Sequence, residues 1–361
     1  MLKKIAVLLS AVLIIAAALS GCGNRSGAGS STKEDTFRVA MVTGIGGVDD
    51  KSFNQSSWEG MKKFAEDNDL KTGSDVKYLE SSQPSDFSPN LHELINQKYN
   101  LIIAIGFQMQ SDIQKIAQQS PDAHFALVDS VAVDKNNKPL KNVANLTFKE
   151  QQGSFLVGVV AGLTTKTNKV GFIGGVDSAL IKKFENGFKA GVKAANPDAE
   201  IYAQYAGAFD APDKGRAIAQ TLYTKGADII YASAGDTGNG VFTEAKSLKK
   251  DGKNVWVIGV DRDQHEEGLP ENVTLTSMVK RVDQAIYDAS SKSRKGNFPG
   301  GQILEYGLKE KGVGIAPTTK NVKPEIIDQV KDYQQKIIDG DITVPSTDKE
   351  YADYLSSLPK K

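Results

Sequence analysis

The sequence predicts an α/β protein with two lobes of similar layout. Strand-like and helix-like segments alternate through most of the chain, which favours a parallel sheet with right-handed crossovers. The strand-like segments are short apolar runs without polar alternation, which is typical of strands covered on both faces. The same order of strands and helices starts again near Val143, so the pattern indicates two lobes rather than one.

The first lobe is expected to begin with a strand at Val39–Val42 and a helix at Trp58–Asp67. Its further predicted elements alternate as strand, helix, strand, helix and strand at Val76–Leu79, Leu91–Asn96, Leu101–Ile105, Ser111–Gln119 and Phe125–Asp129.

The second lobe is expected to repeat this order. A strand-like link at Val143–Thr147 leads to an apolar helix at Gln152–Leu163, which is rich in small residues. The strands predicted after it are Lys169–Ile173, Glu200–Tyr205, Ile229–Ser233 and Val255–Val260, and the helices between them are Leu180–Ala195, Asp213–Lys225 and Val241–Lys250.

The last part of the chain is too short for a third domain and is expected to complete the two lobes in turn. Its predicted elements are a strand at Thr274–Met278, a helix at Lys280–Ser290, a strand at Gln302–Leu308 and a helix at Pro324–Ile338. The chain is expected to cross between lobes near Val143–Thr147, Leu275–Val279 and Pro299–Ile303. We therefore expect an N-terminal lobe of residues 37–145 and 278–300, a C-terminal lobe of residues 146–277 and 301–345, and a surface tail of residues 346–361.

The first residues have the pattern of a signal peptide. A basic start, Met1–Lys4, precedes an almost wholly apolar run, Ile5–Leu19, and small residues then lead to Cys22. The pattern around Cys22 resembles a bacterial lipobox, which implies cleavage of residues 1–21 and lipidation of Cys22. Residues 22–36 then form a tether rich in glycine, serine and charge. A retained membrane anchor is the alternative, for which the apolar run is short.

The composition argues against several classes of function. Acidic and basic residues balance at 44 each, and no basic stripe of the kind that binds nucleic acid is present. Cys22 is the single cysteine, and the three histidines are dispersed, so neither a disulfide nor a metal site is expected. The sequence also has no Gly-x-Ser-x-Gly elbow and no phosphate-binding Gly-Lys-Ser/Thr. We therefore expect no cofactor, no bound metal and no enzymatic activity.

The strongest candidate site is the stretch from Asp49 to Trp58. It follows the first predicted strand and leads into the first predicted helix, and ligands bind in that crevice of open α/β sheets. Carboxylates, hydroxyls, an amide and two aromatic rings are the side chains of a polar and aromatic pocket. An ordinary strand-to-helix loop, with Trp58 as the first core residue of its helix, is the alternative.

Several stretches, in order along the chain, resemble the basic membrane protein family of lipoproteins, specifically its purine-nucleoside receptor branch. These stretches are Asp49–Gln55 with Trp58–Gly60, Ile105–Phe107, Phe125–Asp129, Val143–Phe148, Glu150–Gly158, Gly235–Phe242, Ile258–Asp261 and Ser277–Arg281. No single stretch is decisive, but the series is specific.

The resemblance implies a type I periplasmic-binding-protein fold, with two Rossmann-like lobes joined by a three-strand hinge. It also implies a lipid-anchored, monomeric substrate-binding protein of an ABC importer for nucleosides. The partners would be a nucleoside ligand, the permease and ATPase subunits, and the outer face of the bacterial cytoplasmic membrane.

The resemblance further implies which residues hold the nucleoside. The first loop supplies Asp49 or Asp50, with Asn54 at the base edge and Trp58 stacked on the base. The later stretches supply Asp129, Asp261 and Lys280; a capping or surface role is the alternative for each.

Aromatic and glycine residues complete the predicted site. Phe53 and Phe107 are each assigned either to the pocket wall or to the core, and Gly235 and Gly238 belong to a loop that either meets the ligand or serves the turn. Some relatives carry an aromatic residue where this chain has Asp236, so Phe107 is the substitute candidate for the second stacking ring.

Three rival functions stay open at this level. The same fold could bind a sugar, because sugar sites also combine aromatic rings with Asp and Asn. A nucleoside-cleaving enzyme and a surface interaction protein are the other two. Ligand-dependent stabilisation separates them.

Overall fold

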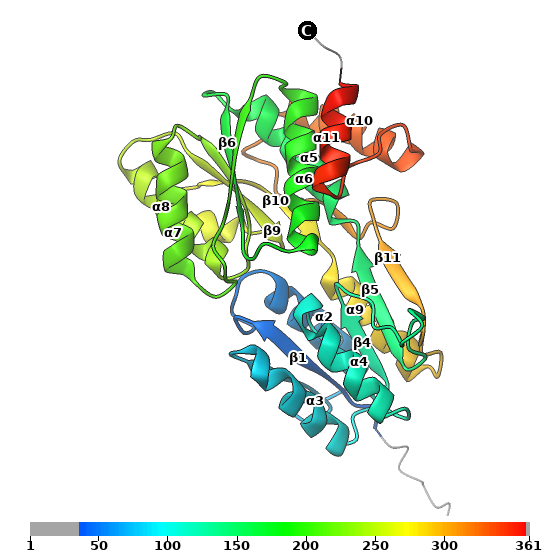
Figure 1. The fold of residues 1–361 in the computed structure, drawn as a ribbon. Helices are drawn as coiled ribbons and strands as arrows, with labels where there is room; N and C mark the ends of the chain where they lie inside the picture. The colour runs from blue at the N-terminus through cyan, green and yellow to red at the C-terminus, as the bar shows by residue number, and fades with distance from the viewer. Residues whose placement is uncertain (1–35, 359–361) are drawn as a thin grey trace, which may run out of the picture. The chain divides into compact units, whose positions relative to one another are not determined.

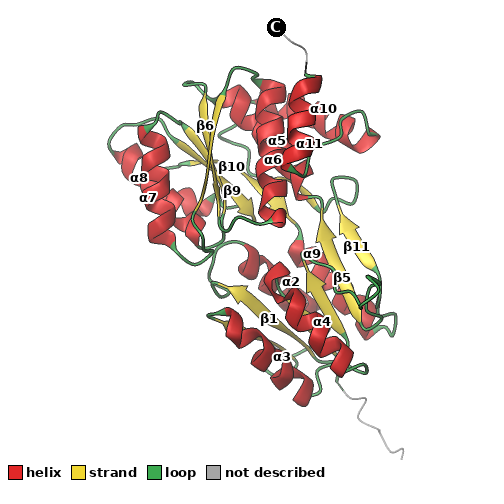
Figure 2. Ribbon diagram, in the orientation of Figure 1, coloured by secondary structure: helices red, strands yellow, loops and turns green. Residues whose placement is uncertain are grey.

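The computed structural model describes residues 36–358. The expected signal peptide, Cys22 and all but the last residue of the expected tether lie outside this range. Figure 1 shows the chain tracing two α/β lobes, and Figure 2 shows strands flanked by helices in each of them.

Each lobe is built on a six-stranded sheet, and the five strands other than the edge strands β11 and β12 have the same order in both sheets, which confirms the predicted fold class. The first sheet has the order β11-β5-β4-β3-β1-β2, and its strands are parallel. Its strands are β1 (Val39–Ile45), β2 (Val76–Ser81), β3 (Leu101–Ala104), β4 (Phe125–Val128), β5 (Val143–Phe148) and β11 (Ile303–Tyr306).

The second sheet has the order β12-β10-β9-β8-β6-β7, and β12 runs antiparallel to β10 at its edge. Its strands are β6 (Lys169–Gly174), β7 (Glu200–Tyr205), β8 (Ile229–Ser233), β9 (Trp256–Asp261), β10 (Thr274–Lys280) and β12 (Val313–Ile315). The central strands β3, β4 and β8 are buried along their whole length, as expected for apolar runs covered on both faces.

Helices cover both sheets and pack in pairs. In the first lobe they are α2 (Phe53–Asp67), α3 (Phe87–Asn96), α4 (Gln110–Gln119) and α9 (Val282–Arg294). In the second lobe they are α5 (Glu150–Thr164), α6 (Ala179–Ala195), α7 (Pro212–Thr224), α8 (Thr237–Lys250), α10 (Pro324–Asp339) and α11 (Asp348–Ser357). The pairs α2 with α9, α5 with α6 and α7 with α8 are in extensive contact.

The pairing of the strands places the boundaries between the lobes at other residues than the sequence predicted. β5 pairs with β4 and β11 up to Phe148, so the first crossing follows Phe148 rather than lying within 143–147. β10 stays in the second sheet up to Lys280, so residues 278–280 belong to the second lobe. β11 pairs with β5, so residues 301–306 belong to the first lobe and the third crossing follows Tyr306.

The expected surface tail also differs from the structure. Residues 348–357 form helix α11, which begins with a capping box at Thr347 and packs against α6. The Asn186 side chain of α6 donates to Asp348 at 3.1 Å, and the Lys189 ammonium lies 4.3 Å from the centre of the Tyr351 ring. This helix was not predicted because the segment is polar and flanked by prolines. The helix α6 against which it packs is far away in the chain.

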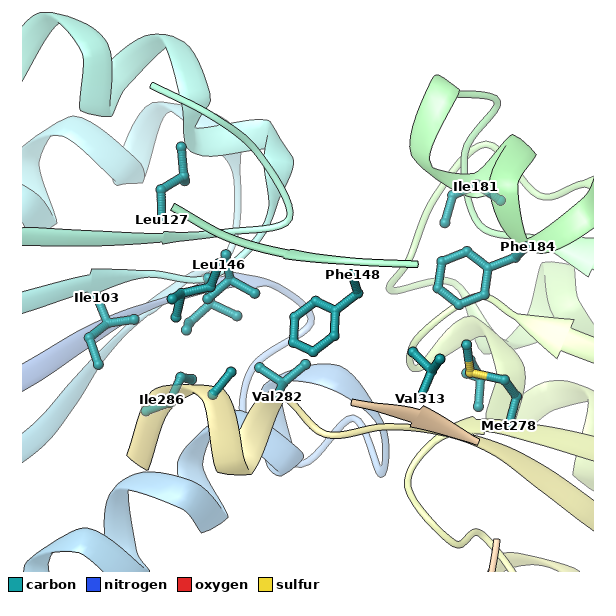
Figure 3. Close-up of a cluster of buried hydrophobic side chains, with 14 of the residues drawn as sticks. Ile103, Leu127, Leu146, Phe148, Ile181, Phe184, Met278, Val282, Ile286 and Val313 are labelled. Carbon is teal, nitrogen blue, oxygen red and sulfur yellow. The ribbon is translucent and has the colours of Figure 1, made fainter. Parts of the chain in front are cut away.

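The three crossing segments are bonded to one another and form the hinge. Lys149 N donates to Tyr306 O at 3.0 Å, and Arg281 N donates to Gly312 O at 2.8 Å. Apolar side chains continue across this hinge: in Figure 3, Phe148 lies between Leu146 of the first lobe and Phe184 of the second. The hinge is therefore held by packed apolar side chains as well as by backbone hydrogen bonds.

Close packing of α5 against α6 depends on glycine. A Cβ on Gly191 would lie 2.0 Å from the carbonyl oxygen of Phe155, so the two backbones can approach only without a side chain there. Gly158 and Gly162 of the predicted apolar helix serve the same contact, because a Cβ there would lie 2.3 Å from Phe188 O and 2.9 Å from Val192 O.

We predict that Gly191→Ala lowers the free energy of unfolding by about 3 kcal/mol, because the helices must separate to admit the methyl group. Urea unfolding measures the change. Gly314→Ala is the matched control, because a Cβ there meets no atom within 4 Å. Equal stability of the two variants would contradict the packing argument.

Candidate functional site

A pocket of about 580 Å³, its solvent-open mouth included, lies at the carboxyl ends of strands from both sheets. This is where ligands bind in open parallel sheets. The first lobe lines it with Gly44, Ile45, Asp50, Phe53, Asn54, Ile105, Gly106, Phe107, Gln108 and Asp129. The second lobe lines it with Leu180, Ile181, Phe184, Phe209, Ser233, Ala234, Gly235, Asp261 and Lys280.

Asp50, rather than Asp49, is the pocket carboxylate of the first loop. Asp50 is 2% exposed and accepts backbone N–H bonds from Ser52, Asn54 and Gln55 at 2.8–3.0 Å. Asp49 is exposed and does not line the pocket. The Asp50 carboxylate thus fixes the start of α2, where the helix dipole favours a negative charge.

Asn54 is held against the first strand. Its Oδ1 accepts from Gly44 N at 2.9 Å, and its amide nitrogen lies 3.5 Å from Ile45 O. The amide nitrogen is thus only weakly engaged by the protein, and Asn54 lines the pocket as predicted.

Asp129 and Lys280 meet across the two lobes. Lys280 ends β10 and donates to Asp129 Oδ2 at 2.6 Å. Both side chains are buried, with exposed fractions of 1% for Lys280 and 4% for Asp129. The other oxygen, Asp129 Oδ1, is buried without a hydrogen-bond partner. A buried acceptor of this kind is costly unless something donates to it.

Asp261 mirrors Asp129 in the second sheet. Asp129 directly follows β4 and Asp261 is the last residue of β9, and both have a φ of 66°, a left-handed conformation that is rare for residues other than glycine. The Asp261 carboxylate accepts from the Ser52 hydroxyl of the first lobe at 2.5 Å. Each sheet therefore aims one carboxylate at the pocket, and each of them bonds to the opposite lobe.

Lys280 is surrounded by carboxylates and aromatic rings. Its ammonium lies 3.3 Å from Glu150 Oε1, and the centres of the Phe53 and Phe148 rings are 5.0 and 4.9 Å away. Burial alone would lower the pKa of Lys280, but the charges of Asp129, Glu150 and Asp261 together raise it. Lys280 is therefore a permanent cation in the pocket.

Burial dominates the titration of the two strand-end carboxyl groups. It raises the pKa of Asp129 to about 6 and that of Asp261 to about 6, although the Lys280 ammonium lowers both. Both groups are largely ionised at neutral pH and act there as hydrogen-bond acceptors.

Four phenylalanines give the pocket its apolar walls. Phe53 and Phe107 come from the first lobe, and Phe184 and Phe209 come from the second. The Phe107 and Phe209 rings meet edge to face with centroids 6.5 Å apart. Phe107 and Phe53 thus line the pocket, which is one of the two positions that the sequence left open for them.

Trp58 does not line the pocket, contrary to its expected stacking role. It packs edge to face on Tyr78 of β2, with centroids 5.0 Å apart, and contributes to the core of the first lobe. Helix α2 begins at Phe53, and five residues at about 100° each place Trp58 on a different face of the helix from Phe53. The sequence misplaced the helix start, and hence the ring that faces the pocket.

The Gly235–Gly240 loop contributes less than predicted. Gly235 lines the pocket, whereas Gly238 lies inside α8 and does not. Asp236 accepts from the Asn239 side chain at 2.8 Å and is also not part of the lining. The second lobe supplies two other rings to the pocket, Phe209 from the loop after β7 and Phe184 from α6.

Phe184, Phe209, Ser52 and Glu150 were not predicted. Phe209 and Ser52 follow the strands β7 and β1, so the rule that pointed to Asp129 and Asp261 could have found them. Glu150 is the first residue of α5, Phe184 lies in the second turn of α6, and neither gave a local signal.

Polar contacts outside the pocket also join the lobes. Glu59 of α2 accepts two bonds from the Arg262 guanidinium, at 2.8 and 3.1 Å. Gln264 Nε2 donates to Lys51 O at 2.9 Å, and Asn239 Nδ2 donates to Asp50 O at 3.2 Å. The first loop is thus held to the second lobe at Asp50 and Lys51, and the following helix α2 is held at Glu59.

Within residues 36–358, no group of three or more His, Cys, Asp and Glu side chains is placed to hold a metal ion. In the same range, no helix combines the length and apolarity needed to cross a bilayer.

Two similar α/β lobes, a triple-strand hinge and a pocket between them define a bilobal solute-binding protein. A structure of an ABC transporter solute-binding protein from Aeropyrum pernix K1 matches with a TM-score of 0.78 and 26% identity, covering 89% of this chain and 98% of that one. A sugar transporter structure from Clostridium phytofermentans shares the fold at a TM-score of 0.56 and 17% identity, covering 77% of this chain and 98% of that one.

Residues 37–348 match the family described as ABC transporter substrate-binding protein PnrA-like, and the chain belongs to this family. It is 47% identical to the CD4+ T-cell-stimulating antigen of Listeria innocua, over 95% of this chain and 98% of the relative. It is 40% identical to the ABC transporter nucleoside-binding protein BmpA of Lactococcus lactis, over 96% of this chain and all of the relative. Proteins of this family are membrane-associated and act outside the cytoplasm, as the sequence suggested.

We predict that Asp261 makes the protein less stable as the pH rises from about 4 to about 6.5. The folded-state pKa of about 6 exceeds the ordinary value of 3.8, so in this interval the folded protein holds a proton that the unfolded chain has released. Asp261→Asn should remove this loss, worth about 2–3 kcal/mol across the interval.

Urea unfolding of both proteins between pH 4 and pH 7 measures the difference. Asp122→Asn, at an exposed position, is the control and should follow the unmodified protein at every pH. Parallel stability curves for Asp261→Asn and the unmodified protein would rule out a raised pKa at Asp261.

Proposed function

We propose that this protein captures a nucleoside, most simply a purine nucleoside, between its lobes and delivers it to the permease of an ABC importer. Membership of the substrate-binding family supports the transport role. The name of the lactococcal relative supports a nucleoside as the ligand. Hydrolysis of ATP by a separate subunit would drive transport, and this chain would act as a monomer.

The observation that carries the proposal is the pairing of aromatic walls with strand-end acceptors. A nucleoside has a π-face, N–H groups on the base edge and hydroxyls on the ribose. The rings of Phe107 and Phe209 suit the face, and the unpartnered Asp129 Oδ1 suits a hydroxyl or N–H donor. The weakly engaged amide nitrogen of Asn54 suits an acceptor on the base.

Ligand exchange would proceed by opening about the hinge. The Glu59–Arg262 and Ser52–Asp261 contacts join the lobes, so the lobes must separate there before a ligand can leave. Asp261 lines the pocket and also bonds to the opposite lobe, so a ligand that contacts Asp261 would affect how the two lobes close.

We also propose that the protein is held at the outer face of the membrane by lipid on Cys22. The basic start, the apolar run and the small residues before Cys22 support this anchor. Cys22→Ser should release the protein into the culture medium. Cell fractionation measures this, and retention of the variant in the membrane would favour an uncleaved apolar anchor.

We predict that nucleosides, and not sugars, stabilise the protein against heat. The panel is adenosine, guanosine, inosine, cytidine, uridine, ribose and galactose. We expect a dissociation constant of about 1 μM or tighter, equivalent to about −8 kcal/mol. A ligand at about 100 times that constant should add about 2.7 kcal/mol to the free energy of unfolding.

Stabilisation by a sugar alone would overturn the nucleoside assignment in favour of a sugar-binding protein of the same fold. Chromatography of the incubated mixtures is the second readout. Release of free base would identify an enzyme instead of a receptor. No stabilisation by any small molecule would favour a surface interaction protein.

We predict opposite effects at two aromatic residues. Phe209→Ala should weaken nucleoside binding tenfold or more, because base–aromatic stacking contributes about 1–3 kcal/mol. Trp58→Ala should leave the affinity within about threefold and lower the free energy of unfolding by about 2 kcal/mol, because Trp58 packs in the core.

Calorimetric titration gives the affinities, and urea unfolding gives the stabilities. If the Trp58→Ala variant kept its stability but lost nucleoside binding, Trp58 would be the ring that stacks on the base, and the prediction would be wrong.

A further inference from the structure

The charged groups at the pocket carry more negative than positive charge. The carboxylates that line it or touch its lysine are Asp50, Asp129, Glu150 and Asp261; the ammonium groups are Lys280, in the lining, and Lys183, which touches Glu150. Four carboxylates against two ammonium groups leave an excess of two negative charges when all are ionised.

This excess is located at the two strand-end carboxylates. Asp50 is compensated by three backbone N–H groups at the start of α2. Glu150 is compensated by lysines on both oxygens, with Lys183 at 3.1 Å and Lys280 at 3.3 Å.

The remaining pair, Asp129 and Asp261, depends on Lys280 for positive charge. Asp129 bonds to it through one oxygen, and its second oxygen is buried without a hydrogen-bond partner. Asp261 has a neutral hydroxyl, that of Ser52, as its hydrogen-bond donor. Burial raises the pKa of both groups, and the Lys280 ammonium lowers it only in part.

The pocket suits an organic cation better than a metal ion. Among the described residues, no carboxylate and histidine side chains converge in the number that a metal site needs. The pocket walls are phenylalanine rings, whose faces attract cations, and the centres of two of these rings, Phe53 and Phe184, already lie 5.0 and 5.6 Å from the Lys280 ammonium. A charged organic ligand could use both the rings and the free carboxylate oxygen.

We propose that the pocket selects nucleosides by charge: it binds positively charged nucleosides more tightly than neutral ones and excludes those that carry a negative charge. This inference rests on the proposed function. It predicts that modified nucleosides with a cationic group are ligands, and that nucleotides are not.

A series that differs in charge at one atom tests the inference. 5′-Amino-5′-deoxyadenosine is a cation at pH 7, adenosine is neutral, and adenosine-5′-carboxylic acid is an anion. Calorimetric titration should show the cation binding about tenfold tighter than adenosine and the anion at least tenfold weaker, because buried charges interact through a low effective dielectric.

Variants show whether the carboxylates cause this order. Asp261→Asn removes a carboxylate of the lining, and Glu150→Gln removes one behind Lys280, where it does not line the pocket. Each should reduce the ratio of adenosine to cation dissociation constants at least threefold. The ratio cancels a general loss of binding, and Asp122→Asn should leave it unchanged.

The outcomes separate this inference from the function on which it rests. If no member of the series binds and no nucleoside of the panel stabilises the protein, the nucleoside assignment fails, and the charge selection fails with it. If all three bind equally, the nucleoside assignment stands and the charge selection is overturned. A cation preference that survives both carboxylate variants would also overturn it, because the preference would then come from the 5′ group alone.

Discussion

The structure depends on a buried ion pair that joins the two lobes. Lys280 ends the last parallel strand of the second sheet, directly before a hinge crossing, and Asp129 follows β4 of the first sheet. Removing one partner of a buried pair leaves an uncompensated charge, which is far costlier than losing a surface ion pair. The same contact therefore fixes how the sheets meet and supplies the positive charge of the pocket.

Around this pair the two sheets contribute in the same way. Asp129 and Asp261 occupy corresponding strand ends and share the left-handed backbone that turns a carboxylate toward the pocket. Strained conformations of this kind persist where the surroundings hold them. Here Lys280 holds one carboxylate and Ser52 the other, each from the opposite lobe. Ligand recognition and lobe contact are thus properties of the same side chains.

Sequence reasoning found most of the pocket because one rule governs it. Short apolar runs identify parallel strands, and the polar residues after them, such as Asp129 and Asp261, must gather at one edge of each sheet. The rule failed for Trp58 because the residue at which α2 begins decides which side chains face the pocket. A start displaced by about one helical turn puts a different ring there. It failed for Glu150 because that carboxylate meets Lys280 and Lys183 only when α5, α6 and β10, which are far apart in sequence, pack together in the second lobe.

The sequence alone determined the two-lobed α/β fold, the absence of an internal disulfide and the strand ends that carry the candidate site. These follow from local patterns of apolar and polar residues, which neighbours in the chain are enough to specify. Only the tertiary structure decided that Asp50 rather than Asp49 faces the pocket, that Phe184 and Phe209 supply the second-lobe rings and that residues 303–306 return to the first sheet. Those facts depend on helix phase and on strand pairing between segments far apart in sequence, where local pattern carries no information about the partner.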